Sequence, residues 1–450
     1  MKKTMLFLFL LLIIPEVIFA LGDTSFIDVK IGKTYEIFEK LDISSDTNLA
    51  LYQKNDLDNE IIVFNDHKIY AAKTFGVDNK IDLYSSENQY ITSIPSDGSV
   101  LIGPEIGRES IIKVALKDYR GYIAFIQDHN GMKIINHLDV ENYLKGVVAR
   151  EIPSLSPKEA LKAQAVAARS YAYSSLTKHS KENYNLCDTT HCQVYGGFSD
   201  EKTQTNQAIE ETRDMVVKYN DLIANTVFHS SSGGYLESSE NIWGSKLSYL
   251  KAKEDPYSLN SKNSIWNIDL DLNLLTSILN DNGYKINNLK DIRILDTYIS
   301  GRVKNIIINE DSDNLIISGE KFRSLMGTNT IKSTLFKIES ANSTTNMSIY
   351  AKDKNKISTL SDINIISERD KISHNIGSFS IIGKGMEMRR VESKPSSNNN
   401  ANNITLSGKG YGHGVGMSQY GAIEMAKQGF DYIDILKYYY TDVDIRKINW

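Results

Sequence analysis

The sequence predicts an α+β protein in which strands and helices mix without a regular βαβ repeat. Three observations predict this class. Apolar, β-favouring runs bounded by Asn, Asp and Gly fill the first part of the chain, a hairpin signal leads directly into two helices, and strands and short helices then alternate to about residue 338. We therefore expect a mixed strand and helix core with an added strand-rich N-terminal module.

Length and composition limit the classes of protein. A chain of 450 residues is too long for one hydrophobic core, so two or three domains are expected. The chain is 41% hydrophobic and 24% charged, which excludes a wholly disordered protein. A net charge of −5 gives no basic excess for a phosphate backbone, so no nucleic acid partner is expected. With 2 Cys and 7 Pro, the chain is not a disulfide-stapled or collagen-like scaffold.

The first residues predict export. Lys2 and Lys3 precede an apolar run at residues 5–14, and a small-residue exit follows at Ala20 or Gly22. This pattern is typical of a secretory signal peptide, which we place at residues 1–22. A retained membrane anchor is the alternative, although the run is short for a membrane span. The body of the protein is therefore expected outside the cytoplasmic membrane, either exported to the wall or held at the membrane.

Residues 23–117 form the expected strand-rich accessory module. The runs at 61–64 and 99–102 are apolar and β-favouring, and turn-forming residues bound them. No chemical motif occurs there, so we interpret the module as a surface-binding or spacer segment.

The predicted core covers residues 118–440 and opens with a hairpin and two helices. Asn130-Gly131 between two strand-like runs is a hairpin signal. Asp139 can cap a helix whose apolar side chains recur at helical spacing, and Pro153 ends it. Ser156 and Glu159 predict a capping box for a second, alanine-rich helix that continues to about residue 176.

The last part of the core changes composition. Residues near 340–405 are rich in Ser, Asn and Lys and predict a flexible excursion. A Gly-rich segment at 408–421 then leads into two short amphipathic helices, and residues 441–450 are predicted as a C-terminal tail.

Glu151 is the first candidate for chemistry. It ends the first predicted helix just before Pro153, where partial burial and the helix C-terminus would both raise the pKa of a carboxyl group. A carboxyl that stays protonated near neutral pH is what a general acid requires. The alternative is an ordinary surface glutamate that pairs with Arg150 or Lys158.

The second candidate is the segment from Cys187 to Cys192. Cys187, His191 and Cys192 are soft ligands of the kind that zinc selects, and His179 lies just upstream. The spacing is not that of a zinc finger. A disulfide between Cys187 and Cys192 is the alternative, since the protein is expected to be exported.

Two Gly-bearing polar segments are further candidates. His413 lies in the Gly-rich run, where alternating glycines allow close approach of a ligand or of another part of the chain. His229 is followed by three serines and two glycines, but no G-x-S-x-G elbow is present for a serine hydrolase. Each segment is equally compatible with a tight structural turn.

Taken together, several blocks of the sequence resemble the SpoIID/LytB family of stage II sporulation protein D. The blocks occur in family order over about residues 118–440, and lie at 143–153, 163–171, 187–195, 229–234, 300–303, 333–336 and around His413. The resemblance implies a lytic transglycosylase that cleaves peptidoglycan glycan strands, with Glu151 as the catalytic acid. It also implies a zinc ion on the cysteines and histidines, with His179 as the first ligand.

The resemblance further implies a one-carboxylate mechanism. Glu151 would protonate the glycosidic oxygen between MurNAc and GlcNAc and then take the proton of the muramyl C6 hydroxyl, leaving a 1,6-anhydroMurNAc end. The side chains expected to hold the sugars in this mechanism are Arg169, Tyr171, Gln193, Tyr195, His413 and Gln419. We also expect the Gly-rich segment to line the same cleft as Glu151.

Two other functions were weighed. LytB-like members modify a cell-wall amidase, so the chain could bind the wall and this partner without cutting glycan. A zinc amidase or peptidase is the third possibility, but no H-E-x-x-H helix is present. The presence of Glu151 favours the enzyme.

Overall fold

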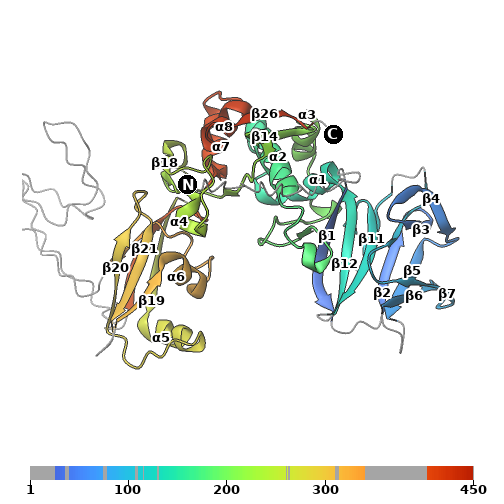
Figure 1. Ribbon diagram of the computed structural model, residues 1–450, viewed down its shortest axis with the longest axis horizontal. Coiled ribbons are helices and arrows are strands. Elements are labelled where there is room, and N and C mark those ends of the chain that lie inside the picture. Colours follow the sequence, from blue (N-terminus) through green and yellow to red (C-terminus); the bar gives the residue numbers. More distant parts are fainter. Residues whose placement is uncertain are drawn as a thin grey trace, which may run out of the picture. The chain divides into compact units, whose positions relative to one another are not determined.

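The structure is a computed structural model. It describes residues 26–35, 40–73, 79–106, 110–114, 116–128, 131–259, 261, 264–309, 314–339 and 403–448. The chain forms two compact units: unit 1 comprises Met1–Thr226 with Asp444–Trp450, and unit 2 comprises Val227–Val443 (Figure 1). The predicted signal peptide lies outside the described residues, as does the predicted excursion up to residue 402.

Unit 1 contains a seven-stranded sheet with the order β13-β1-β12-β11-β8-β3-β4 (Figure 1). The predicted hairpin is present at its centre, where Asp128 of β11 pairs with Gly131 of β12. The strands are β1 (Phe26–Tyr35), β3 (Leu49–Gln53), β4 (Asp56–Val63), β8 (Val100–Pro104), β11 (Tyr122–Asp128), β12 (Gly131–Asp139) and β13 (Leu186–Cys187).

This sheet joins the predicted accessory module to the predicted core. β1 pairs with β12 over most of its length, and β8 pairs with β11. Ile27, Val29 and Ile31 of β1 are buried, so their apolar faces belong to one continuous core. The compact unit therefore continues past the predicted boundary at residue 117, and a separate role for residues 23–117 stays a prediction.

A second, six-stranded sheet of unit 1 has the order β10-β9-β2-β5-β6-β7. Its strands are all antiparallel to their neighbours. They are β2 (Leu41–Ser45), β5 (Lys68–Lys73), β6 (Lys80–Ser85), β7 (Tyr90–Pro95), β9 (Ile112–Val114) and β10 (Lys117–Tyr119).

The helices of unit 1 follow the hairpin as predicted. Asp139 caps α1 (Val140–Glu151) by accepting a hydrogen bond from the Asn142 N–H. The capping box of α2 (Lys158–Ser174) was predicted wrongly: Pro157 occupies the N-cap and no side chain caps this helix. Pro157 holds the extended backbone of an N-cap, so the helix begins one residue later than predicted.

A small sheet and three short helices complete unit 1. β26 pairs with β14, so part of the predicted C-terminal tail is a strand of this unit. The elements are η1 (Ser180–Glu182), η2 (Phe198–Asp200), α3 (Thr203–Glu211), β14 (Met215–Tyr219), β15 (Leu222–Ile223) and β26 (Asp444–Lys447).

Unit 2 has two three-stranded sheets around an apolar core that includes Phe322, Leu275 and Leu406. The sheets are β19 (Ile265–Asp271), β24 (Asn403–Lys409) and β23 (Phe336–Glu339), and β20 (Asp291–Thr297), β21 (Val303–Asn309) and β22 (Asn314–Ser318). Two strand pairs are β16 (Phe228–His229) with β25 (Met417–Ser418) and β17 (Tyr235–Leu236) with β18 (Lys253–Glu254).

The helices of unit 2 are short. They are α4 (Ser239–Trp243), η3 (Pro256–Ser258), α5 (Leu272–Asp281), α6 (Gly319–Met326), α7 (Gln419–Lys427) and α8 (Tyr432–Tyr439). The last two are the predicted amphipathic pair, and α8 buries Ile435, Leu436 and Tyr439. Over the described parts of the chain, no helix has the length and apolar character needed to cross a membrane. Strands and helices mixed in this way confirm the α+β class.

Candidate active site and metal cluster

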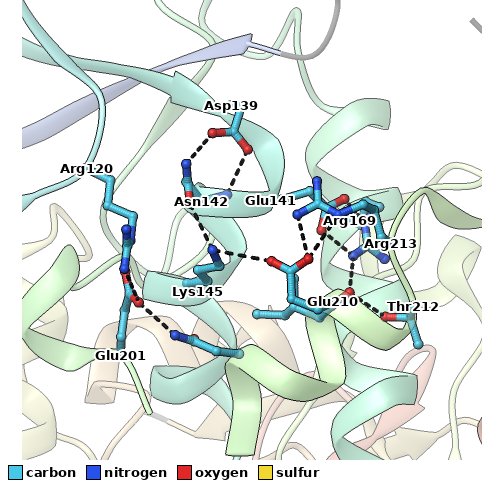
Figure 2. A network of polar contacts seen from close by, with 12 residues as sticks. Arg120, Asp139, Glu141, Asn142, Lys145, Arg169, Glu201, Glu210, Thr212 and Arg213 are labelled. Atoms are coloured by element: carbon cyan, nitrogen blue, oxygen red, sulfur yellow. Dashed lines mark hydrogen bonds and ion pairs between the residues drawn. The ribbon is translucent and has the colours of Figure 1, made fainter. Parts of the chain in front are cut away.

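A buried ion pair fixes the start of the helix that carries Glu151. Arg169 of α2 donates from Nε and Nη2 to the two carboxylate oxygens of Glu141 in α1, at 2.7 Å each (Figure 2). Its Nη1 also donates to the Met215 carbonyl at 3.0 Å. Arg169 is 0% exposed. Arg169 thus joins α1, α2 and β14, and its contact with sugar stays a prediction.

Charged side chains on the surface of α1 extend this network. Lys145 lies 3.4 Å from Glu210 of α3, and Glu210 also accepts from Arg213 at 2.6 Å (Figure 2). Exposed pairs of this kind contribute little each. The buried pair of Arg169 and Glu141 is therefore the main polar contact that sets the position of α1.

Glu151 is the last residue of α1. Its Oε1 accepts a hydrogen bond from the Val194 N–H at 3.0 Å. Arg150 lies 3.6 Å from Asp200, and Lys158 lies 2.6 Å from Glu211, so both cations that were weighed as partners of Glu151 pair with other carboxylates. The carboxyl group thus faces the loop that follows the cysteine and histidine segment.

Gln193 and Tyr143 hold that loop in place. The Tyr143 hydroxyl donates to Gln193 Oε1 at 3.2 Å, and Gln193 Nε2 donates to the Ala168 carbonyl of α2 at 3.3 Å. Burial raises the pKa of Tyr143 well above its usual range, and Cys192, Tyr171 and Glu151 are close enough to add to this shift. Gln193 is 1% exposed and fixes the loop next to Val194, and its contact with sugar stays a prediction.

Tyr195 has a structural role in the same loop, and its predicted contact with sugar stays a prediction. Its ring is buried against Tyr143, and its hydroxyl donates to Asn136 at 2.8 Å. A Cβ added to Gly146 of α1 would come within 2.5 Å of this ring, so the glycine allows the helix and Tyr195 to pack closely. Tyr195 therefore fixes the loop to α1 from inside the core.

Tyr171 lies at the edge of the same region. It is 9% exposed, and its hydroxyl accepts a hydrogen bond from Lys178 Nζ at 3.1 Å. Tyr171, another residue predicted to bind sugar, is thus linked to the segment that follows α2. Its contact with substrate stays a prediction.

Four side chains converge after α2. One ligand atom each from His179, Cys187, His191 and Cys192 lies within 4.8 Å of all the others. Cys192 Sγ is 3.4 Å from His179 Nε2, and His191 Nδ1 is 3.7 Å from both sulfurs. Both cysteines are free thiols, which disagrees with the disulfide alternative. This cluster has the ligand types and spacing to hold a metal ion.

Further hydrogen bonds orient the ligands. His179 Nδ1 lies 3.1 Å from Glu182 Oε1, which leaves Nε2 to face Cys192. The hydrogen bond from Cys192 lowers the pKa of Cys187, and one from Thr189 acts in the same direction. A carboxylate behind a ligating histidine and a stabilised thiolate are typical of metal sites.

His413 and Gln419 lie in unit 2, so the structure does not test their predicted approach to Glu151. His413 Nε2 donates to the Phe228 carbonyl at 3.1 Å, and its Nδ1 accepts from the Val415 N–H at 3.1 Å. Burial lowers the pKa of His413 to about 3, so the ring is neutral. One ring nitrogen is thus bonded to β16 and the other within the Gly-rich segment, and the ring packs against His229 and Trp243. Gln419 is buried at the start of α7.

The serine segment after His229 is structural. Ser232 donates to Asp255 at 2.7 Å, and its carbonyl accepts from Arg302 at 2.8 Å. Burial lowers the pKa of His229 well below its usual value. Among the described residues, His229 Nδ1 donates to the Val415 carbonyl at 3.0 Å.

Three contributors to the site were missed from the sequence. Glu141 lies about one turn before Leu144, on the buried face of α1. A charged residue at such a position could have indicated a buried ion pair. Lys178 gave no signal. Val194 acts through its backbone N–H, which no side-chain pattern can reveal.

The fold and site define an α+β protein with a glutamate at a helix end beside a cluster able to hold a metal ion. Residues 128–219, which include Glu151 and all four cluster residues, match the family model described as stage II sporulation protein. An uncharacterized protein of Brachyspira hyodysenteriae is 30% identical over 333 residues, covering 74% of this chain and 73% of that protein. The chain belongs to the SpoIID/LytB family.

Two relatives have descriptive names. The amidase enhancer of Bacillus subtilis is 33% identical over 308 residues, covering 66% of this chain but 39% of the enhancer. Stage II sporulation protein D of the same organism is 25% identical over 333 residues, covering 69% of this chain and 75% of that protein. The similarity thus extends well beyond the segment matched by the family model.

Proposed function

We propose that this protein is an exported lytic transglycosylase that cleaves the MurNAc–GlcNAc bond of peptidoglycan during wall remodelling linked to sporulation. One observation carries the proposal: Glu151 ends α1 with its carboxyl group held by the Val194 N–H, beside a loop fixed on both sides. A single, rigidly held carboxyl group is what a one-carboxylate mechanism needs. Export, by a cleaved signal or a retained anchor at residues 1–22, belongs to the same proposal.

In the first step Glu151 acts as a general acid. Because Oε1 accepts from the Val194 N–H, Oε2 is the oxygen that would carry the transferred proton. This proton passes to the glycosidic oxygen as the bond to the muramyl C1 breaks. The GlcNAc leaves with a free hydroxyl group, and positive charge develops at C1 next to the new carboxylate.

In the second step the carboxylate acts as a base. It takes the proton of the muramyl C6 hydroxyl, and the oxygen closes on C1 to form the 1,6-anhydro ring. The proton on Glu151 is thereby restored, and no water is consumed. Ordinary glycosidases need a second carboxylate to activate water or attack C1, and this reaction does not.

The cluster of His179, Cys187, His191 and Cys192 is proposed to hold zinc. A tetrahedral zinc with bonds of roughly 2.3 Å to sulfur and 2.0 Å to nitrogen separates these ligands by about 3.5 Å. The measured sulfur–nitrogen distances of 3.4–3.7 Å fit this geometry. Four protein ligands fill the coordination of zinc, so the ion would contribute folding free energy.

The main test of this proposal replaces the carboxyl group of Glu151. Glu151→Gln keeps the shape of the side chain and removes its acidic proton, so release of anhydro-ended fragments should fall by about two to four orders of magnitude. Fragments from purified peptidoglycan are measured by mass spectrometry. Glu159→Gln is the matched control. Glu159 lies on α2, where its carboxylate pairs with Lys162 of the same helix. A folded Glu151→Gln protein of normal activity would exclude the proposed mechanism.

Metal analysis tests the zinc proposal separately. The purified protein should carry about one equivalent of zinc, and a chelator should lower its thermal midpoint. Cys187→Ser and Cys192→Ser should each release the ion. Because the chain has 2 Cys, a thiol titration under denaturing conditions reports on this pair alone. Metal-free protein without titratable thiols would establish the disulfide instead.

A second candidate function is a modifier of a cell-wall amidase. It is favoured by the similarity to the protein named amidase enhancer. Under this alternative, the chain binds the wall and stimulates a purified amidase, while Glu151→Gln stimulates it equally well. Anhydro products from the chain alone favour the enzyme, and amidase stimulation without such products favours the modifier.

A further inference from the structure

Lys178 lies between the two halves of the proposed site. It follows α2 in the chain, where its N–H donates to the Ser175 carbonyl at 3.0 Å. Its Nζ donates to the Tyr171 hydroxyl at 3.1 Å and also to the His191 carbonyl. One ammonium group therefore joins α2 to the loop of the metal cluster.

The hydrogen bond from Lys178 makes the Tyr171 hydroxyl oxygen an acceptor and leaves its hydrogen to be donated elsewhere. An ammonium group only donates hydrogen bonds, so the phenol oxygen is the acceptor and its own hydrogen points elsewhere. No residue in the described ranges accepts this hydrogen. A hydroxyl that accepts from a cation is polarised and becomes a stronger donor. Tyr171 thus presents a directed O–H donor at its partly open edge.

A short series of contacts links this donor to Glu151. Tyr143 is near enough to both Tyr171 and Glu151 for each to raise its pKa. Gln193 bonds to Tyr143 and to the carbonyl of Ala168, one helical turn before Tyr171. The next residue, Val194, holds the Glu151 carboxyl group. Tyr171 and Glu151 are thus connected through Tyr143, Gln193 and Val194.

We propose that Lys178 is a positioning residue that holds the Tyr171 hydroxyl as a hydrogen-bond donor to an amide carbonyl of the glycan, such as that of an N-acetyl group. This inference rests on the proposed function, because it takes the substrate to be an N-acetylated glycan. Lys178 also bonds to the carbonyl of His191, a residue of the metal cluster. The position of the cluster loop therefore affects the direction of the Tyr171 hydroxyl.

The test compares four variants. Tyr171→Phe removes the donor, Lys178→Met removes the group that orients it, Lys178→Arg keeps the charge, and Lys181→Met changes an exposed lysine on the following turn. KM and kcat are measured with peptide-free glycan chains prepared from purified peptidoglycan. Metal content and thermal midpoint are measured for each variant.

The expected result is a rise in KM of about tenfold for Tyr171→Phe and for Lys178→Met, as for the loss of one hydrogen bond. The double variant should be no worse than either single one, because both remove the same bond to substrate. Lys178→Arg should recover part of the affinity, and Lys181→Met should match the unaltered protein. Metal content should stay unchanged in all variants.

Two outcomes overturn the inference. Normal KM in Lys178→Met excludes the positioning role, and strictly additive losses in the double variant show that the two side chains act separately. A binding experiment separates failure of this inference from failure of the proposed function. Calorimetry measures binding of the same glycan chains to the Glu151→Gln variant and to the Glu151→Gln/Lys178→Met double variant. If the unaltered protein releases no anhydro product, a loss of this binding still supports Lys178, and unchanged binding refutes it.

Discussion

Each unit contains a fully buried arginine, and the two are stabilised differently. In unit 1, Arg169 is matched by the carboxylate of Glu141 through two hydrogen bonds of 2.7 Å. In unit 2, Arg302 donates from Nη2 to the carbonyls of Ser232 and Tyr235, while its Nε and Nη1 have no partner among the described residues. Burial lowers the pKa of Arg302 to about 10.

The nearest compensation for Arg302 is indirect. Ser300 donates to the buried carboxylate of Glu237 and accepts from the Arg302 backbone N–H. The guanidinium lies against Gly414, where an added Cβ would come within 2.2 Å of Nη2. The comparison teaches that a buried arginine in a family block can serve as one half of an ion pair or as a donor to backbone carbonyls around a glycine turn.

The largest expected effect comes from breaking the matched pair. Arg169→Met leaves Glu141 buried without its partner, which should lower the free energy of unfolding by about 3–5 kcal/mol. Denaturant unfolding measures the change. The double variant Arg169→Met/Glu141→Leu removes both charges and should recover much of the loss. A double variant as unstable as the single one would contradict the role of the unpaired charge.

A smaller loss is expected for Arg302→Met. This change removes a guanidinium that has no ion pair and leaves two backbone carbonyls without a donor, for about 1–3 kcal/mol. The same denaturant experiment gives the value. A loss as large as that of Arg169→Met would show that the two arginines are equivalent after all.

The smallest effect concerns pH and the neutral histidines of unit 2. Burial lowers the pKa of His413 to about 3, below the value of about 6.5 expected for the unfolded chain. The unfolded state therefore binds the proton first, and stability is lost as pH falls from about 6.5 toward 3. The thermal midpoint should drop by a few degrees between about pH 7 and pH 5.

His413→Gln serves as the comparison for this pH effect. The amide can still donate and accept a hydrogen bond but does not titrate in this range, so the drop in midpoint should become smaller. His229, whose pKa is also lowered by burial, remains to give a residual slope. An identical pH dependence in His413→Gln would exclude His413 as the source.

Local patterns predicted local structure well. The hairpin at Asp128 and Gly131, the Asp139 cap and the end of α1 at Glu151 each depend on a few neighbouring residues. The pairing of β1 with β12 joins segments about a hundred residues apart in the chain, and no local pattern encodes that register. The boundary at residue 117 was therefore placed from composition alone.

The same distinction applies to the site. Soft ligands close together in the sequence predicted the cluster, because Cys187, His191 and Cys192 lie in one loop. The burial of Arg169 and Tyr195 was not predictable, since their partners Glu141 and Asn136 lie on other elements. Both residues were predicted to contact sugar, and the structure adds that each of them holds neighbouring elements together.

The strand β26 has a consequence for the order of assembly. It pairs with β14, and the Ile448 N–H donates to the Asp214 carbonyl, so residues 444–448 close a sheet begun more than two hundred residues earlier. Synthesis runs from the N-terminus, so this sheet of unit 1 is completed only after unit 2 has been made. A chain truncated just before residue 444 would contain all of unit 2 but would lack β26 of unit 1. One edge of β14 would then be unpaired, and β14 is the strand whose Met215 carbonyl accepts a hydrogen bond from Arg169.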